Sequence, residues 1–154
     1  MATIATARAN RSKLSIDNAR IQFDSFSTGE FITQVAPIFS KGFQALARNG
    51  AKSRVIIGAI HNEDLVESTL EKIRPNNGDF AAKLIYKSSS IPYQIIDHKE
   101  VWIPTQKKTE SSFPCFLWTN DKSIVQFYDE SFEEAWNSRH AISIYPEETL
   151  RREN

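Results

Sequence analysis

The middle of the chain alternates between short apolar runs and stretches in which apolar residues recur every three or four positions. Residues 53–60 (SRVIIGAI) are β-branched or apolar on both faces, which predicts a central parallel strand. Further short runs predict strands at 20–24, 81–87, 92–97, 100–104 and 114–118. Helical spacing fills most of the intervals, so strands and helices alternate along the chain.

Two helices are expected between the first two strands. Ser27 precedes Glu30 by the spacing of a capping box, so a short helix should begin there. Pro37 lacks an amide hydrogen and should break that helix. A second helix should then start with Pro37 in its first turn and end at Asn49-Gly50, a typical helix stop.

Two later helices carry apolar faces. The first follows the strand at 53–60 and is expected to be capped by His61-Asn62. The second, at residues 120–138, is expected to pack an aromatic face on a sheet rather than line a cofactor pocket. That face consists of Val125, Tyr128, Phe132 and Trp136.

This order of elements predicts an α/β fold with a mixed β-sheet flanked by helices. Asp97-His98-Lys99 is short enough for a hairpin turn, which makes part of the sheet antiparallel. We expect a disordered N-terminal tail at residues 1–18, a single domain at 19–146 and a charged extension at 147–154, which should lead away from the domain. The basic, acid-poor composition of the N-terminal tail fits either a solvated segment or a targeting peptide. Residues 105–112 hold no hydrophobic side chain and should form an exposed loop.

Composition narrows the classes of function. Nineteen basic and nineteen acidic residues give a formal net charge of zero, so no overall field attracts nucleic acid or an acidic membrane. No apolar run reaches the roughly 20 residues needed to span a bilayer, and we expect a cytoplasmic protein. Cys115 is the one cysteine, which excludes an intrachain disulfide and a cysteine-rich zinc site.

Motifs for chemistry are sparse. His61, His98 and His140 are far apart and lack partners at the usual metal-ligand spacings, so we expect neither a metal nor a cofactor. GxGxxG, GxxxxGK[ST] and GxSxG are all absent, which removes the common phosphate loops and the nucleophile elbow. Asp97-His98 could act as an acid–base pair, or both residues could be solvated parts of a turn.

A ligand is expected at the strand-to-helix junctions. In open α/β sheets, ligands collect beyond the carboxyl ends of strands, where helix N-termini point free amides outward. Thr119 and Asn120 could bind such a ligand or could cap the last helix. The candidate ligand-binding residues are Gly58, His61, Asn62, Asp97, His98, Thr119 and Asn120.

The C-terminal part of the sequence resembles a known sensor family. Residues 117–142 run from an apolar strand through the Thr119-Asn120 turn into an amphipathic helix that ends in Ala135-Trp136-Asn137. This segment resembles the end of the phospholipase D-like sensor domains attached to archaeal two-component histidine kinases. It is also similar to the effector domain of archaeal TrmB-type transcription regulators. The resemblance covers residues 27–148 and implies a phospholipase D-like half-domain architecture.

The resemblance implies a non-catalytic sensory or regulatory domain of signal transduction, whose partner is a small ligand or a signalling protein. Active phospholipase D-type enzymes carry a His-x-Lys-x-x-x-x-Asp motif, and Glu63, Glu100 and Ile142 occupy the lysine position after the three histidines here. Two alternatives stay open. One is a degenerate phosphodiesterase or nuclease that uses His98 and Lys99, and the other is a structural module, such as a homodimer.

Overall fold

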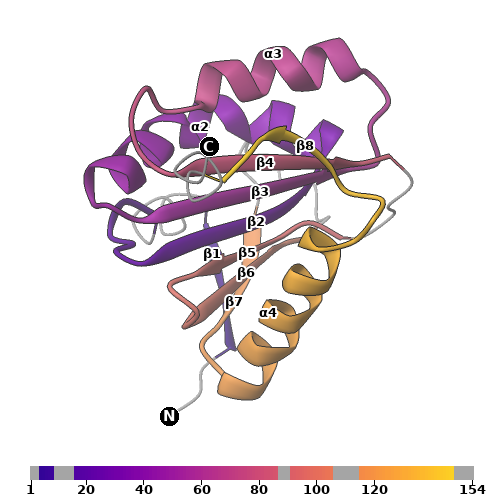
Figure 1. Cartoon of the computed structure of the whole chain (residues 1–154). Coiled ribbons are helices and arrows are strands. Elements are labelled where there is room, and N and C mark those ends of the chain that lie inside the picture. Colours follow the sequence, from indigo (N-terminus) through magenta and orange to yellow (C-terminus); the bar gives the residue numbers. More distant parts are fainter. Residues whose placement is uncertain (1–3, 9–15, 87–90, 106–114, 148–154) are drawn as a thin grey trace.

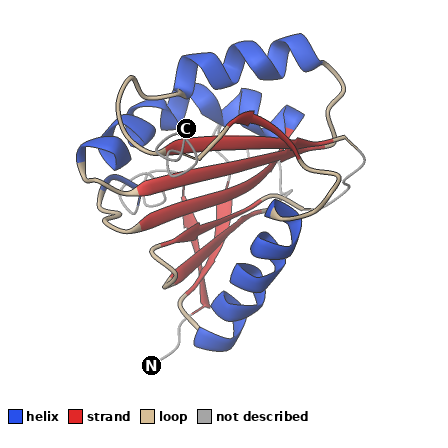
Figure 2. Ribbon diagram, viewed as in Figure 1, coloured by secondary structure: helices blue, strands red, loops and turns tan. Residues whose placement is uncertain are grey.

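The chain folds around one mixed sheet that is covered by helices on both faces. The computed structural model describes residues 4–8, 16–86, 91–105 and 115–147. The sheet has eight strands in the order β1-β7-β6-β5-β2-β3-β4-β8. Helices α2 (Gly29–Arg48) and α3 (Glu63–Ile73) lie on one face, and α4 (Lys122–Trp136) lies on the other (Figure 1). Figure 2 shows the same three layers by secondary structure.

Strand directions divide the sheet into a parallel centre and antiparallel flanks. The parallel strands are β2 (Gln22–Thr28), β3 (Lys52–Gly58) and β4 (Phe80–Ile85). The antiparallel strands are β5 (Tyr93–Ile96), β6 (Glu100–Pro104), β7 (Cys115–Thr119) and β1 (Ile4–Arg8) beside β2, and β8 (Ile142–Tyr145) beside β4. The predicted α/β fold with a mixed sheet is confirmed, and each predicted strand is present within a few residues.

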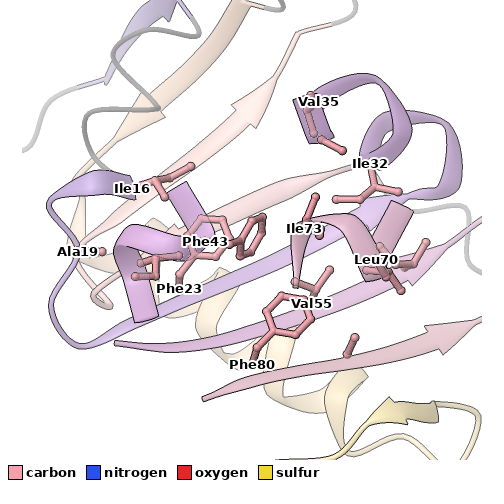
Figure 3. Packing of buried hydrophobic residues seen from close by; sticks show 14 of the residues in the cluster. Ile16, Ala19, Phe23, Ile32, Val35, Phe43, Val55, Leu70, Ile73 and Phe80 are labelled. Atoms are coloured by element: carbon pink, nitrogen blue, oxygen red, sulfur yellow. The ribbon is translucent and has the colours of Figure 1, made fainter. Parts of the chain in front are cut away.

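The central strand β3 is buried on both faces, as its continuous apolar run predicts. Val55 and Ile57 point toward α2 and α3, and Ile56 points toward α4; all three are fully buried. Figure 3 shows the core on the α2 and α3 side, where aromatic rings such as Phe23 and Phe43 meet edge to face at 5.5 Å. On the other side, the predicted aromatic face of α4 is confirmed, with Trp136 only 2% exposed.

The expected break at Pro37 is wrong, because α2 is one helix of 20 residues that contains this proline. Pro37 lies on the exposed side of the helix, while Val35 and Phe43 on either side of it are buried in the core. Tertiary packing on the sheet therefore holds the two halves together, although the proline removes one backbone hydrogen bond. The cap is Thr28, whose hydroxyl accepts from the Phe31 amide at 3.1 Å.

Both termini take a larger part in the fold than the sequence predicted. Residues 4–8 form β1, which pairs with β7, and Ile16 is 1% exposed in the core, so these parts of the expected tail are ordered. At the other end, Glu147 binds Lys52 and accepts from the Trp136 indole at 2.8 Å instead of leading away. Apolar periodicity did not reveal β1, because its place is defined by backbone pairing with an edge strand.

Some expectations fall on segments that the structure does not describe. These are most of the N-terminal tail, the loop at 106–112 and the extension beyond Glu147. Within the described parts of the chain, no helix combines the length and apolar character needed to cross a bilayer.

Candidate functional site

The predicted site residues lie at two opposite edges of the sheet. Gly58 is the last residue of β3, and His61 and Asn62 follow it at the edge where the parallel strands end, here called the carboxyl edge. The turn after β5 and the end of β7 lie at the other edge, here called the amino edge, because both strands run antiparallel to the parallel centre. Asp97, His98, Thr119 and Asn120 are therefore at the amino edge, and one pocket shared by all seven residues is impossible.

At the carboxyl edge, the observed contacts are those of a helix cap. Asn62 accepts from the Leu65 amide at 3.1 Å, so the predicted cap of α3 is confirmed. His61 is exposed, and Gly58 is buried in the ladder between Thr28 and Ile85. Their role in ligand binding stays a prediction.

At the end of β7, the cap of α4 is Asp121, one residue later than expected. Its carboxylate accepts from the amides of Ser123 and Ile124 at 3.0 and 3.1 Å. Thr119 is 5% exposed, and its hydroxyl accepts from the Asp121 amide at 3.1 Å. The prediction that Thr119 or Asn120 caps the helix is therefore wrong, because the aspartate carboxylate reaches two amides of the first turn at once.

Asp97 fixes the hairpin turn between β5 and β6 to the start of β2. Its carboxylate accepts from the backbone amides of Arg20, Ile21 and Gln22 at 3.1, 2.8 and 3.0 Å. Asp97 and His98 have φ values of 53° and 57°, as a type I′ turn requires. The hairpin is confirmed, and the Asp97 side chain is used for structure rather than presented as an acid–base partner of His98.

His98 is held between two oxygen acceptors. Its Nδ1 lies 2.9 Å from Asp129 Oδ1 on α4, and its Nε2 lies 3.3 Å from Gln22 Oε1 at the start of β2. Asp24 orients the side-chain amide of Gln22, because both of its carboxylate oxygens accept from Gln22 Nε2 at 2.9 and 2.8 Å. Gln22 therefore offers His98 an acceptor, and so does Asp129.

Behind this histidine lies a buried ion pair between neighbouring strands. Arg54 Nε and Nη2 donate to the two oxygens of Asp24 at 2.8 and 2.9 Å, the geometry of a bidentate pair. The side chains are 6% and 2% exposed. Arg54 also binds Glu133 of α4, and its guanidinium carbon lies 4.9 Å from the ring centroid of Phe132. A charge this deeply buried is stable only with such partners.

The pKa values of this network follow from the same contacts. Burial opposes the charge of Arg54, but the hydrogen bonds to Asp24 and Glu133 outweigh it and raise the Arg54 pKa. The hydrogen bond from Arg54 is the main reason that the Glu133 pKa is lowered. Burial alone would raise the pKa of Glu147, but hydrogen bonds from Lys52 and Trp136 lower it.

Three possible metal ligands meet where these contacts converge. One ligand atom each from Asp24, His98 and Asp129 lies within 4.8 Å of the others. We call these three residues, together with Gln22, Arg54 and Glu133, the amino-edge cluster. It joins two parallel strands, a hairpin turn and a helix, and it combines the buried carboxylate of Asp24 with the partly exposed side chains of His98, Asp129 and Glu133.

Sequence reasoning identified only His98 of this cluster. Asp129 is 31 positions from His98 in the chain, so no spacing rule for metal ligands links them. A usable signal was present in the strands. Asp24 and Arg54 are charged residues inside runs that otherwise predict buried strands, and such charges must pair with each other or with a ligand.

Two small cavities lie among the described residues. One of about 10 Å³ lies under α2, with Ser25, Ser27 and Gln94 among its lining residues. Another, of about 150 Å³, is a polar hollow at the start of β4, lined by Arg74, Asn76 and Asn77 among others. Sites for drug-sized molecules usually measure about 300–1,000 Å³. Both of these cavities are smaller than that.

No protein-family model and no curated protein sequence matches the chain. Solved structures do match it. One is a phospholipase D family member, Nuc from Salmonella typhimurium, with a TM-score of 0.72 and 12% identity over 95% of this chain and 100% of that one. Another is TrmBL2, described as an archaeal chromatin protein with a novel mode of DNA binding, with a TM-score of 0.53 and 14% identity. That match covers 86% of this chain and 51% of TrmBL2, so the chain spans about half of its length.

Identities this low establish the fold alone. The mixed sheet, the helices on both faces and the near-complete coverage of Nuc agree with the architecture that the C-terminal resemblance implied. The chain has a phospholipase D-like fold.

Proposed function

We propose that this protein is a non-catalytic sensory or regulatory domain of cytoplasmic signal transduction, which binds a small ligand or a signalling protein at its amino edge. The proposal rests on the contacts that the ring of His98 makes. Each of its ring nitrogens faces an oxygen acceptor, Asp129 Oδ1 or Gln22 Oε1. A histidine that attacks a substrate or removes a proton needs a lone pair that no other group contacts, and both ring nitrogens of His98 lie against side-chain oxygens.

The wider surroundings support the same proposal. The resemblance of residues 117–142 is to sensor domains, and TrmBL2, which has a related fold, is described as an archaeal chromatin protein with a novel mode of DNA binding. Proteins that share one fold can have different functions, so the function must be argued from the residues of the site. At this site, Asp24 and Arg54 satisfy one another. His98 and Asp129 are partly exposed, so a partner can reach them.

Thermal unfolding with a panel of metabolites, inorganic anions and metal ions tests ligand binding. A ligand at 100 times its dissociation constant should stabilise the protein by about 2.7 kcal/mol. The stabilisation should be lost in His98→Ala and kept in His140→Ala, which removes an exposed histidine that is not a candidate ligand-binding residue. If no compound raises the melting temperature and no signalling protein binds in a His98-dependent manner, the proposal is wrong.

One observation favours an enzyme as the second candidate. His98 and Asp129 are 2.9 Å apart, and an acidic residue that orients a histidine is common in catalytic sites. Lys99 follows in the same turn. Hydrolysis of bis(p-nitrophenyl) phosphate by the purified chain, lost in His98→Ala and retained in His140→Ala, would establish a phosphodiesterase and overturn the non-catalytic proposal.

A further inference from the structure

We propose that the amino-edge cluster binds a divalent transition-metal ion, with Zn²⁺ as the best fit, through Asp24, His98 and Asp129. This inference rests on the proposed function, because it names the chemical class of the small ligand. The ligand atoms lie within 4.8 Å of one another. Atoms bound to one metal at about 2 Å must lie within roughly 4 Å of each other, so small side-chain rotations close the site.

The charges of the cluster favour a cation. The cluster holds three carboxylates, those of Asp24, Asp129 and Glu133, and one guanidinium, that of Arg54, which binds Asp24 and Glu133. With His98 neutral, three negative charges against one positive charge leave two negative charges uncompensated, and a divalent ion cancels them. The nearby Lys52 does not change this balance, because it is paired with Glu147.

The ligands are also held in place from behind. Arg54 donates to both oxygens of Asp24, which fixes the plane of that carboxylate. The left-handed backbone of His98, at φ 57°, is secured by the contacts of Asp97 with the start of β2. Groups that orient a ligand in this way raise metal affinity in known sites.

The side-chain amide of Gln22 contacts both Asp24 and His98, two of the three proposed ligands. Its Nε2 lies almost equally far from the two oxygens of Asp24, at 2.9 and 2.8 Å. Rotating the amide by half a turn would bring Oε1 there instead, as a fourth ligand oxygen. An amide group thus serves as the donor in the empty cluster and can serve as a ligand in the loaded one.

The ligand types decide which ion fits. One imidazole nitrogen with carboxylate oxygens suits Zn²⁺ and its first-row neighbours, whereas Mg²⁺ prefers oxygen ligands alone in octahedral geometry. Three ligands from the chain would leave at least one position to Gln22 or to water. The site should therefore prefer Zn²⁺ to Mg²⁺ by a wide margin.

Calorimetric titration of the full chain with ZnCl₂ and with MgCl₂ tests the inference. We expect one Zn²⁺ per chain, at least tenfold weaker binding in His98→Ala and Asp129→Asn, and unchanged binding in His140→Ala, which removes an exposed histidine outside the cluster. Asp129→Asn keeps the shape of the side chain, and circular dichroism of each variant confirms that it is folded. Co²⁺ bound in place of Zn²⁺ should give a visible absorption band that disappears in His98→Ala. Cys115 is present in every variant, so its contribution cancels.

Three results would overturn the inference: no heat of Zn²⁺ binding, equal affinity for Zn²⁺ and Mg²⁺, or full affinity in His98→Ala. Failure of the metal site is distinguishable from failure of the proposed function. If Zn²⁺ does not bind but another compound stabilises the chain through His98, the metal inference falls and the sensory proposal stands. If His98-dependent phosphodiesterase activity appears, the sensory proposal falls whatever the titration shows.

Discussion

Replacing Arg54 by methionine should be one of the most damaging single changes in this protein. Arg54 is 6% exposed, donates to both oxygens of Asp24 and binds Glu133 of α4. Its guanidinium also lies over the rings of Phe132 and Trp136, with centroid distances of 4.9 and 5.3 Å. Methionine keeps most of the side-chain volume and removes the charge, so the change isolates the electrostatic contribution.

The loss of folding stability in Arg54→Met depends on the partners that Asp24 keeps without the arginine. Asp24 is 2% exposed, and without Arg54 it keeps only the Gln22 amide among the contacts described above. Breaking a buried ion pair by removing one partner typically costs about 3–5 kcal/mol. The total free energy of unfolding of a domain is about 5–15 kcal/mol, so Arg54→Met should remove about a fifth of it or more.

A double-mutant cycle separates the pair from the burial of the side chains. The variants are Arg54→Met, Asp24→Leu and the two combined, each unfolded in urea at pH 7. Replacing both charges by apolar groups of similar volume is often neutral or stabilising. The double variant should therefore unfold within about 1 kcal/mol of the parent, which makes the coupling energy about 3 kcal/mol or more.

Two outcomes would refute this reasoning. If Arg54→Met is as stable as the parent, Asp24 has another partner or reaches solvent, and the ion pair is not what holds the two strands and α4 together. If the double variant loses the sum of the two single losses, the residues act independently and their hydrogen-bonded geometry carries no coupling.

Four further changes test other parts of the argument by urea unfolding. Trp136→Ala should lower the free energy of unfolding by about 3–5 kcal/mol, because the side chain is 2% exposed. An unchanged urea midpoint would contradict the packing of α4 in the core. Asp121→Ala removes the cap of α4 and should lower the free energy of unfolding by about 0.5–2 kcal/mol. A change near zero would show that this cap does not stabilise the helix. Ala59→Gly should stabilise by up to about 1 kcal/mol, since Ala59 has φ 49°; a loss would show that the strain is compensated. The pKa of Glu133 is lowered in the folded state, so its stabilising effect is full above its unfolded pKa and disappears as the pH falls through the folded pKa. The stability difference between Glu133→Gln and the parent should therefore shrink between pH 7 and pH 3, and a constant difference would contradict the ion pair with Arg54.

Periodicity predicted the elements that bury apolar side chains. β3 and α4 were predicted because a run apolar on both faces and a stripe at intervals of three and four have direct packing consequences. It failed at Pro37, where local propensity favours a break but burial on both sides of the proline holds α2 continuous. It also missed β1, because backbone pairing with an edge strand leaves no required pattern in the side chains.

The site was harder to predict than the fold, and the reason is topological. Strand direction decides which edge a residue occupies, and sequence does not reveal that β7 runs opposite to β3. The predicted residues were therefore split between two edges. Asp24 and Asp129 join His98 only after β2, the hairpin turn and α4 are in place. Tertiary structure creates the cluster, so neither local spacing nor a motif could reveal it.

The two faces of the sheet are held by different forces, and this difference bears on function. The α2 and α3 side packs through a continuous apolar core. All four ion pairs of the described residues lie on the α4 side or at the amino edge next to it. Hydrophobic packing responds little to pH or ions, whereas ion pairs respond to both. A cation or charged partner that binds Asp129 and Asp24 together would tie α4 to the sheet, so the position of α4 is the feature of this fold best suited to report binding.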